Sequence, residues 1–235
     1  MKMYMVGGAV RDSFMGIKSR DVDFAVEAES YDAMKQGLVD QGFRIWLENP
    51  EFFTIRAHVP TGHWASLSAK DGDFVLCRKD GVYTDGRRPD TVEVGTIYDD
   101  LARRDFTMNA IAITENGGVI DPHHGKKDIQ DGIVRFVGKP EERIAEDGLR
   151  VLRAIRFVVT KDFILHPNTR DALKSTEAAQ SLSRVSQERI KDELDKMLAH
   201  DTQWTLQLLV YKFPDLLPVI FTRNMHLVTS LKEVV

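Results

Sequence analysis

The sequence contains very little cysteine, since Cys77 is the one thiol in 235 residues. A single cysteine excludes an intramolecular disulfide framework, and without a cysteine cluster we expect no structural zinc site. Cys77 ends an apolar run, so we interpret it as a small core residue in a protein from a reducing compartment.

Long hydrophobic runs and a large excess of basic residues are absent as well. No stretch approaches the ~20 apolar residues of a membrane-spanning helix, and the first apolar run is too short for a signal peptide. We therefore expect a cytoplasmic protein with no membrane partner. The net charge is −4, whereas nucleic-acid-binding domains are often strongly basic.

The charge is distributed unevenly along the chain. Residues 1–138 hold 17 Lys and Arg against 22 Asp and Glu, and residues 139–235 hold 15 against 14. An acidic first part suits a site that holds metal ions. The second part carries a local group of arginines at positions 150, 153 and 156.

Hydrophobic periodicity and turn residues predict an α/β region followed by a helical one. In the first part we expect strands at residues 3–6, 21–26, 52–58, 73–78 and 119–120, and helices at 9–15 and 31–41. Residues 81–90 are rich in turn formers. From Pro140 onward the apolar spacing is helical, Ser186 is a candidate cap for a helix to Ala199, and residues 204–217 read as helical with a break at Pro214.

The sequence Asp21-Val22-Asp23 is a candidate metal site. In a strand, residues two apart point to the same face, so the two carboxylates repel each other unless a cation neutralises them. Mg²⁺ prefers such oxygen ligands together with substrate phosphates. Alone, this pattern is more often a solvated strand edge. Asp73, at the head of a later strand, is a possible third carboxylate, with a surface turn as the alternative.

Gly7-Gly8 lies between a predicted strand and a predicted helix that contains Arg11. Glycine lets the backbone approach a phosphate closely, and a helix N-terminus favours anions. An ordinary turn is the alternative. Combined with the aspartates, the turn predicts a triphosphate site in which two metals activate a 3′-hydroxyl and stabilise the leaving pyrophosphate.

Four long motifs resemble, in order, those of the class II tRNA nucleotidyltransferase and bacterial poly(A) polymerase family. They are Val6–Asp12 with Gly16 and Asp21–Asp23, then Arg103–Ala110, Glu146–Phe157 and Arg184–Ile190, and they span roughly residues 3 to 198. The resemblance implies an α/β nucleotidyltransferase head with a mixed sheet at residues 1–138. It implies an all-helical neck domain, which selects the nucleotide and faces the RNA, at residues 139–235.

The resemblance also implies roles for individual residues. Asp21 and Asp23 would bind the catalytic Mg²⁺ ions, with Asp73 as a third catalytic carboxylate. The residues that would contact the nucleotide are Gly8, Arg11, Arg104, Asp147, Arg150, Arg153 and Arg156.

Asp147 and Arg150 are three residues apart and would share one face of a helix. Asp offers hydrogen-bond acceptors and Arg offers forked donors. The resemblance implies that the two imitate a Watson–Crick partner, because cytosine and adenine both present an amino donor beside a ring acceptor. A simple intrahelical salt bridge is the alternative.

The implied function is addition of CMP and AMP, from CTP and ATP, to the 3′ end of an RNA acceptor, with tRNA expected. Within the class, a poly(A) polymerase or an enzyme that adds part of the CCA end is the alternative. An inert nucleotide- or RNA-binding module is the alternative of another class, and the paired carboxylates argue against it. The oligomeric state does not follow from the sequence.

Overall fold

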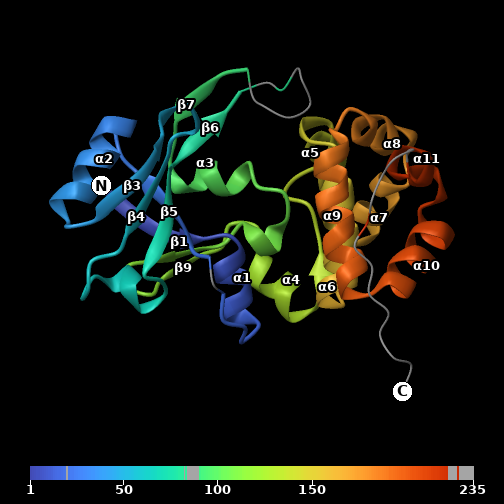
Figure 1. Ribbon diagram of the computed structural model, residues 1–235, viewed down its shortest axis with the longest axis horizontal. Helices are drawn as coiled ribbons and strands as arrows, with labels where there is room; N and C mark the ends of the chain where they lie inside the picture. Colours follow the sequence, from blue (N-terminus) through green and yellow to red (C-terminus); the bar gives the residue numbers. More distant parts are fainter. Residues whose placement is uncertain (20, 82, 84–89, 222–226, 228–235) are drawn as a thin grey trace. The chain divides into compact units, whose positions relative to one another are not determined.

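The computed structural model describes residues 1–19, 21–81, 83, 90–221 and 227. The chain forms two compact units: unit 1 comprises residues 1–81 and 91–131, and unit 2 comprises residues 82–90 and 132–235 (Figure 1). An α/β first part followed by a helical part confirms the predicted fold class. Most of the turn-rich stretch at residues 81–90 lies outside the described residues.

A seven-stranded mixed sheet forms the centre of unit 1, with the strand order β3-β4-β5-β2-β1-β8-β9. β2 and β5 pair in parallel, and every other neighbouring pair in this sheet is antiparallel. The buried rings of Phe24 and Phe74 stack with centroids 5.0 Å apart. The strands are β1 (Lys2–Val6), β2 (Asp23–Glu27), β3 (Arg44–Asn49), β4 (Thr54–His58), β5 (Asp71–Leu76), β8 (Ala112–Thr114) and β9 (Val119–Ile120).

Helices and a short hairpin complete unit 1. Ser30 accepts a hydrogen bond from the amide of Ala33 and so begins α2, and Thr96 forms a capping box with Asp99 at the start of α3. Cys77 is fully buried, as predicted. The remaining elements are α1 (Gly8–Phe14), α2 (Tyr31–Asp40), η1 (Pro50–Phe52), η2 (Trp64–Leu67), β6 (Arg78–Asp80), β7 (Val92–Val94), α3 (Ile97–Ala102), η3 (Thr107–Asn109) and α4 (Gly125–Gln130).

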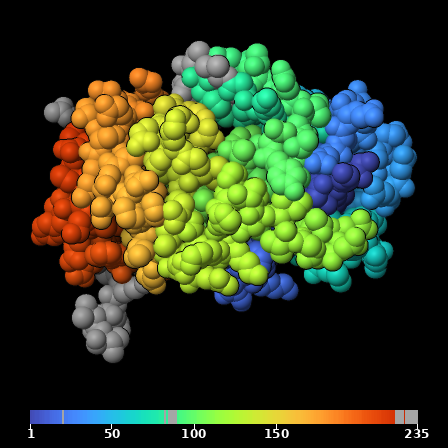
Figure 2. Space-filling model, turned by 180° about the vertical axis from the view of Figure 1, so that it is seen from behind, coloured from blue at the N-terminus to red at the C-terminus, as the bar shows by residue number. Residues whose placement is uncertain are grey.

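Distant parts of the sequence share the surface of unit 1. In Figure 2, green residues lie beside blue ones, in agreement with the pairing of β8 on β1. Unit 1 is therefore built from two sequence segments that fold together.

The described residues of unit 2 are almost entirely helical, apart from one two-stranded parallel pair between β10 and β11. Helix α6 buries Leu152, Ile155 and Val159, and helix α9 buries Ile190 and Leu194. The elements are β10 (Ile133–Val134), α5 (Pro140–Glu146), α6 (Arg150–Lys161), β11 (Ile164–Leu165), α7 (Pro167–Leu173), α8 (Thr176–Ser183), α9 (Gln187–His200), α10 (Thr202–Lys212), η4 (Pro214–Leu216) and α11 (Leu217–Ile220).

The helical run expected after Pro140 is interrupted. Helix α5 ends at Glu146 and α6 begins at Arg150, with Asp147 in an extended conformation between them. A Cβ atom at Gly148 would lie 2.1 Å from the carbonyl oxygen of Ser181, so the backbone of α8 approaches this break more closely than any side chain allows. None of the described helices is long and apolar enough to cross a membrane.

Candidate active site

A turn at Gly7 brings together two of the predicted site residues of unit 1. Gly7 has φ 74° and ψ −139°, a backbone conformation that glycine adopts and other residues avoid. A Cβ atom there would lie 3.2 Å from Nη1 of Arg104 and 3.4 Å from Oδ2 of Asp23. The missing side chain therefore leaves room for a guanidinium and a carboxylate beside the same turn.

The sheet register places Asp23 next to Asp73. Asp23 begins β2, where it is opposite Val6 on one side and opposite Asp73 of β5 on the other. Residues in register on adjacent strands are neighbours on one face of a sheet. Two predicted carboxylates, 50 positions apart in the sequence, are therefore held together by backbone pairing.

Asp23 is an electrostatically unfavourable position for an anion. Desolvation by the surrounding protein raises the pKa of its carboxyl most, the Arg104 guanidinium partly offsets this, and repulsion by Asp73 and Asp21 raises the pKa further. Asp21 lies two residues before β2, so the prediction that both aspartates project from one strand was wrong for Asp21. A bound cation would relieve this repulsion.

The donor set fits a divalent metal that also binds substrate. Among the described residues, no group of three or more metal-binding side chains converges. The carboxylate of Asp73 pairs with Arg56, whose Nε lies 2.6 Å from Oδ1. One or two carboxylates with phosphate oxygens are nonetheless a usual Mg²⁺ environment. The residues therefore fit a metal that is completed by the nucleotide.

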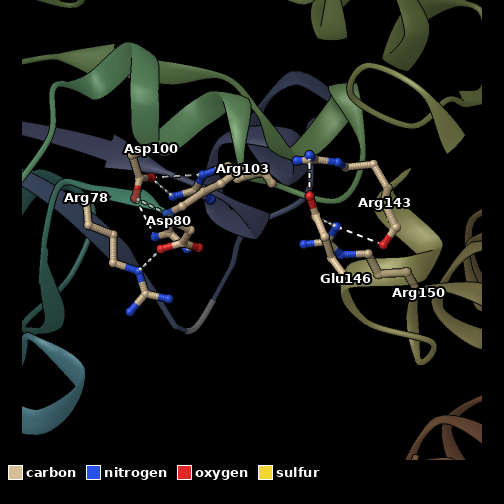
Figure 3. Close-up of polar contacts among 8 residues, drawn as sticks. Arg78, Asp80, Asp100, Arg103, Arg143, Glu146 and Arg150 are labelled. Carbon is tan, nitrogen blue, oxygen red and sulfur yellow. Dashed lines mark hydrogen bonds and ion pairs between the residues drawn. The ribbon is translucent and has the colours of Figure 1, made fainter. Parts of the chain in front are cut away.

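Arg104 is oriented by the buried carboxylate of Asp100. Its Nε and Nη2 atoms donate to Oδ2 of Asp100 at 3.2 and 2.8 Å. Arg103 donates to the other carboxylate oxygen of Asp100 (Figure 3). Burial opposes ionisation of Asp100, but attraction by Arg104 and Arg103 outweighs it and lowers the pKa of this carboxyl. The ion-paired acid fixes the Arg104 guanidinium beside Gly7.

Arg11 is held by a second buried network. Its Nη1 donates to the side-chain oxygen of Asn109 at 2.7 Å, and the Asn109 amide donates to Asp105 at 3.0 Å. Nη2 of Arg11 donates to Asp12 at 2.8 Å and would lie 3.5 Å from a Cβ at Gly8. Arg11 is therefore largely buried and packs against the Gly7–Gly8 turn.

In unit 2, Asp147 and Arg150 have different partners. One carboxylate oxygen of Asp147 accepts from the amide of Leu149 at 3.1 Å, and the other pairs with Nη2 of Arg189 at 2.7 Å. Nη1 of Arg150 donates to Glu146 at 2.6 Å (Figure 3). The prediction of a shared helical face was wrong, because Asp147 lies in the break before α6.

Arg153 and Arg156 lie near the buried Glu193 of α9. Nε of Arg156 donates to Oε2 of Glu193 at 2.5 Å, and Lys196 pairs with the other oxygen. Burial raises the pKa of Glu193, but attraction by Arg156 and Arg153 is stronger, so the pKa is lowered overall. The Arg156 guanidinium also lies 4.4 Å from the ring centroid of Phe157. The pair of Arg156 with Glu193 joins α6 to α9.

Sequence reasoning missed the residues that position the predicted ones. Asp100, Arg189 and Glu193 each hold the charged group of a predicted site residue. Arg189 belongs to a motif already noted, and Glu193 follows it by four positions on the same helix. Asp100 precedes the motif arginines Arg103 and Arg104 by three and four positions. Helical spacing from a motif arginine was therefore a usable signal for Glu193 and for Asp100.

Comparison with known proteins agrees with this architecture. Residues 3–135 match the family described as the Poly A polymerase head domain, and residues 162–216 match a probable RNA and SrmB-binding site of polymerase A. The chain belongs to the Poly A polymerase head domain family, which confirms the resemblance recognised in its motifs.

Two of the similar proteins are CCA-adding enzymes. The chain is 37% identical over 232 residues to the CCA-adding enzyme of Bacillus subtilis, a match that covers 97% of this chain and 54% of that protein. A crystal structure of the Bacillus stearothermophilus CCA-adding enzyme in complex with CTP is 34% identical, with a TM-score of 0.72, over 88% of this chain and 47% of that one.

A third comparison involves RNA. A tRNA nucleotidyltransferase complexed with a primer tRNA and an incoming ATP analog is 30% identical, with a TM-score of 0.73. The match covers 95% of this chain and 61% of that one. The chain thus spans about half the length of the relatives it matches.

Proposed function

We propose that this chain transfers CMP and AMP from CTP and ATP to the 3′ end of tRNA and releases pyrophosphate. The observation that carries the proposal is the approach of Asp23 and Arg104 to the same glycine, Gly7. A carboxylate that can hold a metal then stands beside a cation that can hold a phosphate, which nucleotide transfer requires.

Family membership implies the use of a divalent metal. We assign Mg²⁺, held by Asp23 and Asp21, because carboxylates and phosphate oxygens are its preferred ligands. When bound, Mg²⁺ would activate the attacking hydroxyl and neutralise charge on the leaving pyrophosphate. We also propose a cytoplasmic location, because the composition, with a single buried cysteine at Cys77, suits a reducing compartment.

The reaction forms one bond and breaks one. The 3′ oxygen of the acceptor bonds to the α-phosphorus of the nucleotide, the bond from that phosphorus to the pyrophosphate oxygen breaks, and the hydroxyl proton passes to water. Arg104, Arg11 and the Gly7–Gly8 turn bind the triphosphate, and Arg11 also supports the turn. Asp73 lies beside Asp23 as the third carboxylate.

Base choice is assigned to unit 2. Asp147 offers carboxylate acceptors and Arg150 offers forked donors, which complement the amino group and ring nitrogen that cytosine and adenine share. Arg189 and Glu146 hold these two side chains in place. Arg153 and Arg156, which lie on α6 together with Arg150, are also assigned to nucleotide binding.

The decisive experiment offers each labelled NTP with Mg²⁺ to tRNA transcripts that end before, within or after the CC sequence. CTP addition followed by a single AMP would support the proposal. Repeated ATP addition to any RNA would establish a poly(A) polymerase, an activity consistent with the matched family's description. An Asp23→Asn variant serves as the matched inactive control.

An inert binding module is tested separately. Affinity for CTP is measured with and without Mg²⁺, in the wild type and in the Asp23→Asn variant. Tighter CTP binding with Mg²⁺ that the substitution abolishes supports a metal-dependent enzyme. Metal-independent CTP binding, together with no incorporation on any acceptor, would favour the inert module.

A further inference from the structure

A groove of about 980 Å³ opens within unit 1 beside the predicted catalytic residues. Asp21 and Asp73 belong to its lining, and so do residues that the proposed chemistry leaves without a role. The latter include Lys18, Trp46, Arg56, Leu67 and Lys70, and we call this cavity the Trp46 groove.

The strand register aligns a row of side chains that leads from Asp23 into the groove. Asp23 is opposite Asp73, and Asp73 is opposite Arg56 on the next strand. Trp46 lies at an irregularity of β3 beside Arg56, with its ring centroid 5.9 Å from Cζ of the guanidinium. Arg56 thus links the carboxylates to an aromatic surface on the same side of the sheet.

The order of the strands indicates what approaches along this row. β1, which leads into the Gly7–Gly8 turn, lies on one side of β2, while β5, β4 and β3 lie on the other. In phosphoryl transfer, the attacking and leaving oxygens are roughly in line on opposite sides of the phosphorus. If the triphosphate is bound at the glycine turn, the attacking hydroxyl arrives from the side of β5.

The lining of the groove suits an unpaired RNA strand. Trp46 is 52% exposed and Leu67 is 91% exposed, so apolar surface is open to a nucleobase. Three cations, Lys18, Arg56 and Lys70, are balanced by the carboxylates of Asp21, Asp71 and Asp73. Stacking of a base, which needs no excess charge, is therefore the main attraction that the groove offers.

We propose that the Trp46 groove binds the single-stranded 3′ end of the RNA acceptor, with a base stacked on Trp46 and the adjoining phosphate near Lys70. The proposal rests on the proposed function for the direction of attack. It makes Trp46 a residue that binds the acceptor and leaves nucleotide binding to the glycine turn.

The kinetic test compares Trp46→Ala, Trp46→Phe and Tyr98→Ala in CMP incorporation. Tyr98 is a 59% exposed aromatic residue on α3 and is absent from the groove lining, so it is the matched control. In Trp46→Ala the KM for the RNA should rise roughly tenfold, with the KM for CTP unchanged. Trp46→Phe and Tyr98→Ala should resemble the wild type. An unchanged RNA KM in Trp46→Ala overturns the proposal.

A binding test separates this inference from the proposed function. Fluorescence anisotropy of a labelled single-stranded RNA ending in CC is measured without nucleotide, and Lys70→Ala is added to the series. Weaker binding in Trp46→Ala and Lys70→Ala supports the groove even if no nucleotide is ever incorporated. Equal binding in all variants refutes the groove, even where CCA addition is observed with the wild type.

Discussion

Unit 1 and unit 2 hold their predicted site residues by different means. In unit 1, strand register sets the carboxylate of Asp23 beside that of Asp73, and Gly7 leaves room for Arg104, whose guanidinium is paired with the buried Asp100. In unit 2, side-chain ion pairs hold the predicted site residues: Arg189 pairs with Asp147, and Glu146 pairs with Arg150.

The difference teaches which parts of the site can change partners. Backbone pairing is not exchanged when a ligand binds, whereas an ion pair can be replaced by hydrogen bonds to a base. In the proposed reaction, the chemical step is the same for every nucleotide and benefits from a fixed frame. Base choice between CTP and ATP benefits from side chains that have alternative partners.

The largest effect should come from removing the carboxylate of Asp23. Asp23→Asn should lower nucleotide incorporation roughly 10³-fold, because metal binding supplies several kcal/mol of transition-state stabilisation. Stability should stay equal or rise by less than about 1 kcal/mol at pH 7, because the raised pKa of Asp23 means that its ionisation is unfavourable in the fold.

The pH dependence of that gain has a definite sign. The free-energy cost of ionising Asp23 in the fold is present at high pH and vanishes below the unfolded pKa of about 3.9. The free energies of unfolding of the wild type and of Asp23→Asn should therefore become equal in acid. Urea unfolding of the metal-free proteins at several pH values measures it. An Asp23→Asn variant that loses its near-ultraviolet circular dichroism would show that Asp23 is a structural residue.

The next largest effect concerns the buried ion pair of unit 2. Glu193→Gln should destabilise the protein by about 3 kcal/mol, because Arg156 loses the carboxylate that compensates its charge. The pKa of Glu193 is lowered in the fold, so its contribution is present above about 4.3 and is lost as the pH falls.

The difference in the free energy of unfolding between Glu193→Gln and the wild type, measured by urea titration, should therefore become smaller below about pH 4.3. Glu188→Gln is the control, because Glu188 is exposed in the first turn of the same helix and should cost less than about 1 kcal/mol. Equal losses in the two variants would contradict a special role for the Arg156 pair.

A smaller effect should follow from filling the space at Gly7. Gly7→Ala should cost about 2 kcal/mol of stability, because the backbone conformation is strained for alanine. It should also raise the KM for CTP, since the new methyl group displaces Arg104. Gly62→Ala is the control: its φ is also positive, at 88°, but a Cβ there meets nothing within 4 Å. A raised CTP KM in both variants would mean that backbone strain alone is responsible.

The smallest expected effect is in base choice. Arg150→Ala should reduce discrimination between CTP and UTP about tenfold, as expected for one lost pair of hydrogen bonds to a base. The fold should tolerate the change, because Glu146 keeps its ion pair with Arg143. Competition between the two labelled nucleotides measures the ratio, and Arg150→Lys tests whether charge alone suffices. Unchanged discrimination in Arg150→Ala would remove the residue from base selection.

Elements with local periodicity, caps or turn signals were predictable from the sequence, and those without such signals were not. The helix after Ser186 and the strand near residues 3–6 match α9 and β1 closely, because periodicity and caps are local signals. β9 is two residues long and was predicted at residues 119–120 beside a turn signal, whereas β8 is three residues long and carried no recognised signal. Strands of this length are set by pairing with distant neighbours.

The helix break at Asp147 shows the same limit within the candidate site. Apolar spacing from Ile144 to Val159 reads as one helix, although the pair Asp147-Gly148 within it is typical of a turn. At the break, Gly148 lies so close to the backbone of Ser181, 33 positions away, that a Cβ atom would not fit. Residue identities at the site could be proposed from motifs, but the partners that hold them depend on such distant packing.

The network at Arg11 also has a consequence for folding order. Arg11 and Asn109 are 98 positions apart, and β1 acquires its β8 neighbour only when both segments are present. Such long-range contacts slow folding, because a large loop must close before they form. During synthesis, the aspartates and the glycine turn emerge early but remain an incomplete site. About half of the 235 residues must be synthesised before Arg11 can donate its hydrogen bond to Asn109 and stabilise the glycine turn.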